Sequence, residues 1–422
     1  MAGLIGFEVT VLDNPPFVSG PDPPPEPDGE KPEMRFGHTH KLTWSGRSAL
    51  TLRSTVSSSL AIPAALELAR HVERDAARLA VRFGGGMIPG PIVRLTALGD
   101  PHGGLRRVTR VRFRSGLTLI HKPRPLGPEL IWNRVIRWLG ARAAAGPFLT
   151  PVILPRARYG WVEYLAPRRP ASARQARAFH RRAGTLLALF EVLEVRDVHR
   201  DNLIAVGDQP VLVDGETIAH PRFTAFRRSP SLALTGFLPG LDLRDDHAGL
   251  AAGLPSPAVR ASHYQTELIE GYRDGHAVLR RWGAELLGPA GPLRGLATTP
   301  IRVILRPTAW YRKALRRPGW FRTELAPLPI PRAGHPAVEA LEREALARGD
   351  VPVFHSLGGG TDLWSEGRIV ARSCFRESGL TAVANRLRRL SLADERLGAE
   401  ILTGVLALDG FRGVRSRAGR GR

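Results

Sequence analysis

Apolar side chains recur at helical spacing in three long segments of the chain. In the segment from Ser59 to Phe83 they are Leu66, Ala69, Val72, Ala76, Leu79 and Val81. In the segment from Pro128 to Arg142 they are Ile131, Val135, Trp138 and Leu139. In the segment from Ser172 to Glu194 they are Ala176, Phe179, Ala183, Leu186, Leu187, Phe190 and Leu193. Because residues three or four positions apart share one face of a helix, each segment is predicted to form an amphipathic helix.

Two other segments have the pattern of β-hairpins. From Val108 to Arg114 apolar and basic residues alternate, and a second run ends on Lys122 after the turn Ser115-Gly116. The apolar runs 203–206 and 210–213 flank the turn 207–209 in the same way. Further along, the segment from Ile301 to Thr308 is predicted to be a strand, and the patterns between residues 335 and 409 are mainly helical.

These patterns predict an α+β protein with two lobes. Residues 14–36 contain eight prolines and five acidic residues, a composition that resists helix and sheet, so we assign residues 1–60 to a proline-rich arm or linker. Residues 61–165 form a small β-rich lobe that contains Lys122, and residues 166–410 a larger, mainly helical lobe. Residues 411–422 carry five arginines and no acidic residue, which indicates a solvated basic tail.

Composition narrows the class of protein. With 43% hydrophobic and 24% charged residues, the chain has the balance of a soluble globular protein. No apolar run approaches the roughly 18 residues of a spanning helix, and the N-terminus lacks the basic start of a signal peptide, so we expect a cytoplasmic protein without a membrane span. Cys374 is the single cysteine, which excludes a metal site built from several thiolates of this chain.

The formal charge of +22 raises the question of nucleic-acid binding. Only four of the 61 basic residues are lysines, and the arginines are scattered without interleaved aromatic residues, so we expect no nucleic-acid partner. An acidic peptide or the phosphates of a nucleotide would benefit more from the positive field.

The segment 197–216 contains the most informative group of polar residues. Phosphoryl transfer in kinase-like sites uses an Asp that orients the attacking hydroxyl, an Asn five residues later and a further Asp, and the last two hold magnesium against the phosphates. Asp197, Asn202 and Asp214 have this spacing around the second hairpin. We therefore predict a kinase-like fold in which ATP and Mg²⁺ bind at the open end of this hairpin.

The string His199-Arg200-Asp201 allows a different assignment of the motif, in which Asp201 is the catalytic base. The metal ligand expected five residues later would then be Val206, which cannot bind a metal, so we choose Asp197 as the base. The alternative without function is a polar hairpin end that carries these side chains by coincidence.

A kinase-like site also needs a cation for the phosphates, and Lys122 stands at a strand end. In a chain that favours arginine so heavily, a retained lysine suggests that a compact ammonium is required, although a lone lysine is more often a surface residue. Glu129 is a candidate to orient Lys122, and an ordinary charge at a helix N-terminus is an equal alternative. Glu163 stands where a two-lobed kinase has its hinge.

Several motifs in their order along the chain resemble the dehydratase domain of class II (LanM-type) lanthipeptide synthetases. They are Gly99-Asp100-Pro101-His102, Lys122-Pro123-Arg124, Tyr159 to Glu163, Asp197-Val198-His199 with Asn202, Asp214-Gly215-Glu216, Thr235 to Pro239, Arg302 to Thr308 and Asp350 to Phe354. The resemblance covers residues 90–405 approximately. It implies a lipid-kinase-like fold that phosphorylates Ser and Thr of a ribosomally made precursor peptide carrying a leader segment, and then eliminates the phosphate.

The resemblance also implies roles for single residues. It assigns ATP–magnesium binding and phosphoryl transfer to Lys122, Asp197, His199, Asn202, Asp214 and Glu216. It assigns elimination to Asp100, His102, Arg302 and Thr308. A strand from 301 to 308 would place Arg302, Arg306 and Thr308 on one face, where two arginines suit a leaving phosphate, although such a strand is more often a solvated basic face.

The chain departs from the family pattern in four respects. It has no counterpart of the zinc cyclase, for which Cys374 alone could not supply the thiolates, so we expect a separate cyclase or tailoring enzyme as partner. The region before the core is short and rich in proline, which bears on leader binding. His121 replaces a usual tyrosine, and Gly215 replaces a bulky apolar residue; we interpret both as tolerated changes.

Two other functions fit parts of this sequence. A small-molecule phosphotransferase of the aminoglycoside-kinase type would also carry the residues around Asp197 and Asp214, but it has no need of the segments 99–102 and 302–308. A peptide-binding scaffold without activity would be expected to have lost Lys122, Asp197 or Asp214.

Overall fold

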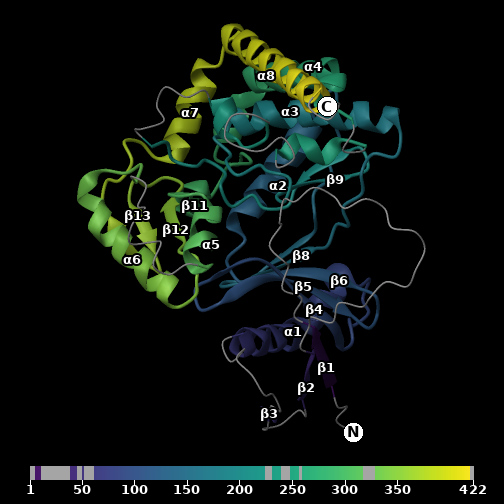
Figure 1. The fold of residues 1–422 in the computed structure, drawn as a ribbon, viewed down its shortest axis with the longest axis vertical. Helices are drawn as coiled ribbons and strands as arrows, with labels where there is room; N and C mark the ends of the chain where they lie inside the picture. The colour runs from purple at the N-terminus through teal and green to yellow at the C-terminus, as the bar shows by residue number, and fades with distance from the viewer. Residues whose placement is uncertain are drawn as a thin grey trace. The chain divides into compact units, whose positions relative to one another are not determined.

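A computed structural model describes residues 5–10, 39–44, 50–51, 61–223, 231–238, 248–255, 259–316 and 328–418 of the chain, the first three ranges by their backbone alone. The chain divides into two compact units. The first comprises residues 1–125 and 152–164, and the second residues 126–151 and 165–422. The protein is a mixed α+β protein, with one sheet-containing and one mainly helical unit, as the sequence predicted (Figure 1).

The first unit is built on a five-stranded antiparallel sheet in the order β4-β5-β6-β8-β7. Its strands are β4 (Ile92–His102), β5 (Arg106–Phe113), β6 (Thr118–Lys122), β7 (Ile153–Pro155) and β8 (Gly160–Glu163). The predicted hairpin is confirmed as β5 and β6, and Lys122 is the last residue of β6. Strands β1 (Ile5–Thr10), β2 (Thr39–Trp44) and β3 (Leu50–Thr51) form a separate three-stranded sheet, and the proline-rich residues 14–36 lie outside the described residues.

Helix α1 (Ala61–Phe83) covers one face of this sheet. Leu68 and Leu79 pack there against Val111, Phe113 and other apolar side chains of the strands. The predicted stripe was wrong at Val81, which is 80% exposed, because the helix turns that position away from the sheet.

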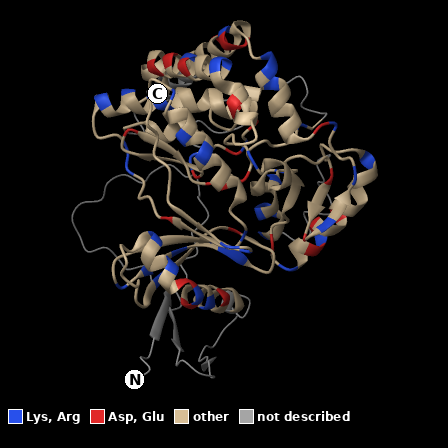
Figure 2. Cartoon of the chain, turned by 180° about the vertical axis from the view of Figure 1, so that it is seen from behind, with Lys and Arg blue, Asp and Glu red and all other residues tan. Residues whose placement is uncertain are grey.

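The face of the sheet opposite α1 is polar. Side chains alternate along each strand, so when Val111 and Phe113 face α1, their neighbours in β5 face the other way. Figure 2 shows basic residues on these strands. Lys122 shares this second face with Thr118, because the two residues are four positions apart in β6.

The second unit is organised around α3 (Ala173–Val192) and α4 (Gln265–Leu287), which lie side by side (Figure 1). Ser172 caps α3 by accepting a hydrogen bond from the Gln175 N–H at 3.2 Å, and the predicted apolar stripe of α3 is buried. The helices approach closely at two glycines. A Cβ at Gly184 would lie 2.0 Å from the Leu268 carbonyl oxygen, and one at Gly271 would lie 1.8 Å from the Arg181 carbonyl oxygen.

Helix α2 (Gly127–Gly140) belongs to the second unit, although the sequence analysis assigned it to the small lobe. Its predicted apolar side chains are buried in the same core as those of α3, and the ring of Trp132 stacks on Phe190 with centroids 5.5 Å apart. This packing explains why residues 126–151 group with the larger unit. The segment 203–212 forms the predicted second hairpin, with strands β9 (Leu203–Val206) and β10 (Gln209–Leu212).

A four-stranded antiparallel sheet, ordered β11-β12-β13-β14, was only partly predicted. Strand β11 (Pro300–Val303) is shorter than the predicted strand, and helix α5 (Thr308–Arg316) begins where that strand was expected to end. Strands β12 (Phe354–Leu357), β13 (Leu363–Ser365) and β14 (Arg368–Ala371) fall in a region predicted as mainly helical. These strands were not predicted, because each has only three or four residues, too few to establish a period of two.

The remaining helices of the second unit are α6 (His335–Ala347), α7 (Gly379–Arg389) and α8 (Leu392–Ala418). Helix α8 continues into the segment that we expected to be a solvated tail. Among the described residues, no helix combines the length and the apolar character that a membrane span requires.

Three buried histidines make the stability of the fold dependent on pH. Burial lowers the pKa of His121 and of His220 from 6.5 to about 3, and that of His180 to about 4. As pH falls through 6.5, the unfolded chain takes up protons that the folded chain does not. Each histidine should therefore remove about 1.4 kcal/mol of unfolding free energy per pH unit between 6.5 and its folded pKa. Urea denaturation at pH 7 and pH 5 measures the effect.

A single substitution tests the origin of this dependence. His180 stacks on the Tyr264 ring with centroids 4.3 Å apart, so His180→Phe keeps the contact and should make the loss of stability in acid smaller. The same change at exposed His263 is the control. Equal unfolding free energies at the two pH values in the wild-type protein would contradict the prediction.

Candidate active site

The loop that precedes β9 brings the predicted phosphotransfer residues of the second unit together. The N–H groups of Asn202 and Leu203 both donate to the His199 carbonyl oxygen, at 2.9 and 2.8 Å, and this turn leads into the hairpin. At the far end of the hairpin, the Val213 N–H donates to the Asn202 carbonyl oxygen at 2.8 Å. Asp214, the next residue, therefore returns to the same end of the hairpin as Asn202.

Asp197 is held by its neighbours in this loop. The Asn202 side-chain amide donates to Asp197 Oδ2 at 3.0 Å and to the Asp197 carbonyl oxygen at 2.9 Å. The second carboxylate oxygen, Oδ1, lies 3.3 Å from His199 Nε2, and about a third of the Asp197 side chain is exposed. The carboxylate is thus oriented from one side and accessible from the other, as a residue that orients a substrate hydroxyl would be.

His199 lies among three aspartates. Burial alone would lower its pKa, but the hydrogen bond to Asp197 and the charges of Asp197, Asp201 and Asp214 outweigh burial and raise the pKa above 6.5. The Asp201 N–H donates to His199 Nδ1 at 3.2 Å, so the backbone also fixes the ring. Asp201 itself is exposed, whereas Asp197 is half-buried.

The donors around this loop fit a magnesium ion that is shared with a nucleotide. Both hydrogen bonds from Asn202 to Asp197 use its amide nitrogen, so the amide oxygen points elsewhere and could serve as a ligand, and Asp214 supplies a carboxylate. Mg²⁺ commonly takes one or two protein ligands and completes its shell with phosphate oxygens and water. In the described part of the chain, no three His, Cys, Asp or Glu side chains are grouped so that they could hold a metal ion by themselves.

Arg302 joins the same group of residues. The Arg302 guanidinium forms an ion pair with the Glu216 carboxylate, and the backbone N–H of Arg302 donates to the Glu216 carbonyl oxygen at 2.9 Å. Burial would lower the pKa of Arg302, but Glu216, Asp197 and Asp214 together raise it. Arg302, which was predicted to act in elimination, therefore lies in the electrostatic field of Asp197 and Asp214, which were predicted to act in phosphoryl transfer.

The prediction that Arg302, Arg306 and Thr308 share one face of a strand was wrong. Strand β11 ends at Val303, and Thr308 begins α5. Arg306 is 4% exposed, and its Nε donates to Glu342 Oε1 at 2.9 Å. Loss of strand geometry after Val303 thus directs Arg302 and Arg306 to different carboxylates, and nothing in the geometry of Arg306 supports a role in elimination.

The other predicted residues lie in the first unit. Asp100 and His102 lie in β4 beside a turn in which Gly103, Gly104 and Leu105 all have positive φ. The register of β4 and β5 shifts next to these residues, as at a bulge. The segment is therefore a glycine-rich turn between the first two strands of the sheet, the position in which kinases cover phosphates. Lys122 is 4% exposed at the end of β6.

Three further residues that the sequence singled out have clear local environments. Glu163 accepts a hydrogen bond from the Val152 N–H at 2.9 Å, and Glu129 is buried in the first turn of α2. His121, at the position of the family's tyrosine, forms a 3.0 Å hydrogen bond with His71 and packs edge-on against Trp161. These contacts support the interpretation of His121 as a tolerated aromatic replacement.

Thr235 and Gly236, for which the sequence suggested no role, lie against the Asp197 loop. The Val198 N–H donates to the Thr235 carbonyl oxygen at 2.8 Å. Gly236 has φ +80°, and a Cβ there would lie 3.3 Å from the Val198 nitrogen. A Cβ at Gly249 would lie 2.4 Å from the Val198 carbonyl oxygen. Close backbone packing from two sides therefore holds Asp197 in place.

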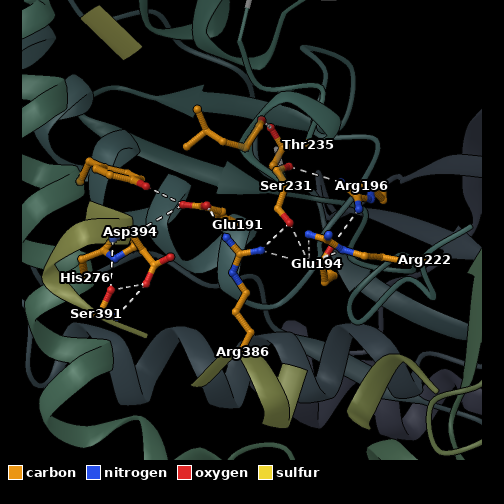
Figure 3. A network of polar contacts seen from close by, with 12 residues as sticks. Glu191, Glu194, Arg196, Arg222, Ser231, Thr235, His276, Arg386, Ser391 and Asp394 are labelled. Carbon is orange, nitrogen blue, oxygen red and sulfur yellow. Dashed lines mark hydrogen bonds and ion pairs between the residues drawn. The ribbon is translucent and has the colours of Figure 1, made fainter. Parts of the chain in front are cut away.

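A buried carboxylate anchors the chain three residues before Asp197, and sequence reasoning missed it. Glu194 is 2% exposed and accepts hydrogen bonds from Arg196 at 2.7 Å, Ser231 at 2.8 Å and Arg222 at 2.9 Å (Figure 3). Burial, with the nearby charges of Arg222 and Arg386, lowers the pKa of Arg196 to about 10, and Glu194 opposes that shift.

Arg386 of α7 extends this network to Glu191 in α3. One of its terminal nitrogens contacts Glu194 at 3.4 Å and Ser231 Oγ at 2.5 Å, and the other forms an ion pair with Glu191. The Tyr272 hydroxyl also donates to Glu191, at 2.5 Å. Burial would raise the pKa of Glu191, but its hydrogen bonds and the charge of Arg386 lower it. We call these residues, together with Arg196, Arg222 and Glu194, the carboxylate network.

The carboxylate network has a conformational consequence. Glu194 and Asp197 have φ of +51° and +60°, a left-handed backbone that costs a residue other than glycine on the order of 1 kcal/mol or more. Such conformations persist when surrounding contacts determine them. The network fixes the first residue, and the packing around Val198 fixes the second.

Glu194→Gln should destabilise the protein by about 3 to 5 kcal/mol, because it removes the buried negative charge that Arg196, Arg222 and Arg386 share. The matched control is Glu285→Gln in the same unit, since Glu285 is 42% exposed and pairs with Arg142. That change should cost less than about 1 kcal/mol. Urea denaturation measures both values, and similar losses in the two variants would refute the anchoring role.

Comparison with known proteins agrees with the motifs. A family model described as "Domain of unknown function (DUF4135)" matches residues 49–254 and 243–356. The lacticin 481/lactococcin biosynthesis protein LcnDR2 of Lactococcus lactis subsp. lactis is 26% identical over 176 residues, a match that covers 37% of this chain and 19% of that relative. Because the family model covers well over half of the chain, the protein belongs to the DUF4135 family and is related to the LanM-type lanthipeptide synthetases.

Proposed function

We propose that this protein dehydrates Ser and Thr residues of a ribosomally made precursor peptide, by ATP-dependent phosphorylation followed by elimination of the phosphate. The observation that supports it most directly is the arrangement at the open end of the β9–β10 hairpin. There Asn202 orients Asp197, and Arg302 lies in the field of Asp197 and Asp214. The similarity to a lacticin 481/lactococcin biosynthesis protein supports lanthipeptide biosynthesis as the setting.

In the first half-reaction, Asp197 orients the substrate hydroxyl and accepts its proton as the hydroxyl oxygen attacks the γ-phosphorus of ATP. The bond from that phosphorus to the bridging oxygen breaks, and ADP leaves. Asn202 and Asp214 would hold Mg²⁺, which neutralises charge on the phosphates when it is bound. Lys122 is the proposed cation for the α- and β-phosphates, and Glu216 holds Arg302.

In the second half-reaction, a base removes the α-proton of the phosphorylated residue, the Cα–Cβ double bond forms, and the Cβ–O bond breaks. The electron pair leaves with the phosphate. Arg302 is the proposed donor to that phosphate, because its guanidinium is pre-oriented by Glu216 and can stabilise the charge as it develops. Asp100, His102 and Thr308 are assigned to this step by the family resemblance alone.

Asp197→Asn should lower phosphate incorporation into peptide by about 10²-fold or more, because the amide cannot accept the proton of the hydroxyl. The matched control is Asp201→Asn, which makes the same change at the exposed aspartate that we rejected as the catalytic base. The readout is the mass of a candidate precursor after incubation with ATP and Mg²⁺: phosphorylation adds about 80 Da. Loss of activity in the Asp201 variant but not in the Asp197 variant would reverse the assignment.

Arg302→Ala should separate the two half-reactions. Transfer should continue while elimination slows by about 10²-fold, so that phosphorylated peptide accumulates instead of dehydrated peptide. Arg302→Lys should keep part of the elimination rate. Because lysine keeps a positive charge beside Glu216, this variant also shows whether an unpaired Glu216 destabilises the protein. Exposed Arg316 provides the control substitution, Arg316→Ala. An Arg302→Ala enzyme that dehydrates normally would favour a plain kinase, and one that leaves the peptide unmodified would place Arg302 in substrate binding.

A further inference from the structure

Three arginines gather on the face of the first unit's sheet that α1 leaves uncovered. They are Arg94 in β4 and Arg110 and Arg112 in β5. Arg94 pairs directly with Arg112 across the two strands, and Arg110 is two residues from Arg112 on the same face. Arg94 and Arg112 are exposed, and Arg110 is half-buried.

These side chains line a hollow of about 250 Å³. Thr96, Thr118 and Tyr164 also line this hollow. A second hollow of about 290 Å³ shares Arg94 and Arg112 and is bordered by Arg114. The two hollows together form a shallow trough along β5, which we call the arginine trough.

The charges in the arginine trough oppose the stability of the sheet. Like charges directly opposite each other on neighbouring strands repel. Within the described residues, neither Arg94 nor Arg112 forms an ion pair with a carboxylate. Arg110 is oriented by a different kind of contact: it donates to the Tyr164 hydroxyl at 3.1 Å, with its guanidinium 5.3 Å from the ring centroid. An unneutralised and partly pre-oriented group of this kind is suited to an anionic ligand.

The spacing of the arginines favours one class of anion. Arg110 and Arg112 project from alternate positions of β5, about 7 Å apart, and Arg114 follows directly after the end of the strand. The acidic side chains of an extended peptide, when they occupy every second residue, recur at the same interval. A single phosphate would occupy only part of two hollows that continue into each other, whereas a peptide could follow them.

The arginine trough lies on the same sheet face as Lys122. Thr118 lines it, and Lys122 follows four residues later in β6, about 13 Å along the strand. A peptide bound there would leave the lysine end of the strand uncovered. The high positive charge of the whole chain would also speed the approach of an acidic peptide.

We propose that the arginine trough, formed by Arg94, Arg110, Arg112 and Arg114, binds an extended acidic peptide segment with carboxylates at alternate residues. Arg94 and Arg112 together grip one carboxylate, and Arg110 and Arg114 contact those on either side of it. Identification of that peptide with the substrate of the enzyme rests on the proposed function; the binding itself does not.

Fluorescence anisotropy with a labelled peptide of alternating glutamate and serine tests the proposal in the absence of ATP. The peptide should bind at low salt, and the double variant Arg94→Gln/Arg112→Gln should weaken its affinity by at least about tenfold. The control is Arg70→Gln/Arg74→Gln, which removes the same charge from exposed positions of α1, on the other side of the sheet. It should change the affinity less than twofold.

Three results would overturn the proposal. Equal weakening by the two double variants would mean that net charge alone attracts the peptide. Displacement of the peptide by ATP or inorganic phosphate would make the trough a phosphate site. Equal affinity for an isomer with all its glutamates adjacent would refute the spacing argument.

Two further measurements keep the outcome interpretable. Arg112→Gln should raise the Tm, because it relieves repulsion from Arg94. Weaker peptide binding by this variant could then not be ascribed to unfolding. A lowered Tm would contradict the inference that the arginines of the trough repel one another. Peptide binding should also be unchanged in Arg316→Ala, which removes an exposed cation of the second unit. Because the assay contains no ATP, the site can be tested even if the proposed phosphotransfer fails.

Discussion

The buried carboxylate of Glu194 is the interaction on which the rest of the candidate site depends. It terminates the central helix α3 in a left-handed residue and ties that point to α7 and to two arginines of the adjoining loops. The chain then has only two intervening residues before Asp197, which is left-handed as well. A shift of Glu194 would therefore also displace Asp197, the residue proposed to orient the substrate hydroxyl.

Charge burial explains why this anchor uses arginine. An unpaired carboxylate in the interior would be costly, and a single partner leaves hydrogen-bonding positions empty. Planar guanidinium groups approach Glu194 from several directions, and that of Arg386 reaches Glu191 and Glu194 at once. A lysine, which carries a point charge on a flexible stem, could not bridge two carboxylates with the same defined geometry.

The arginines on the sheet of the first unit are in the opposite electrostatic environment from those of the carboxylate network. The arginines of the carboxylate network are half-buried and paired with carboxylates, whereas Arg94 and Arg112 face each other without a carboxylate among the described residues. The first arrangement stabilises the fold and needs no ligand. The second opposes the stability of the sheet, as groups retained for binding often do. Composition alone cannot distinguish the two, because both appear as arginine in a basic chain.

What the sequence determined by itself was local. The spacing of Asp197, Asn202 and Asp214 placed them at one end of a hairpin, since strand pairing and a short turn suffice to bring residues of a 20-residue segment together. The helix stripes and the position of Lys122 at the end of β6 followed from periodicity in the same way. The tertiary structure decided the pairing of charges. Arg386 is 192 residues from Glu194, and Arg302 is 86 residues from Glu216. A period of two in the sequence suggested that Arg302 and Arg306 act together, but the strand ends at Val303, because backbone direction there is set by packing against distant elements rather than by the residues of the segment itself.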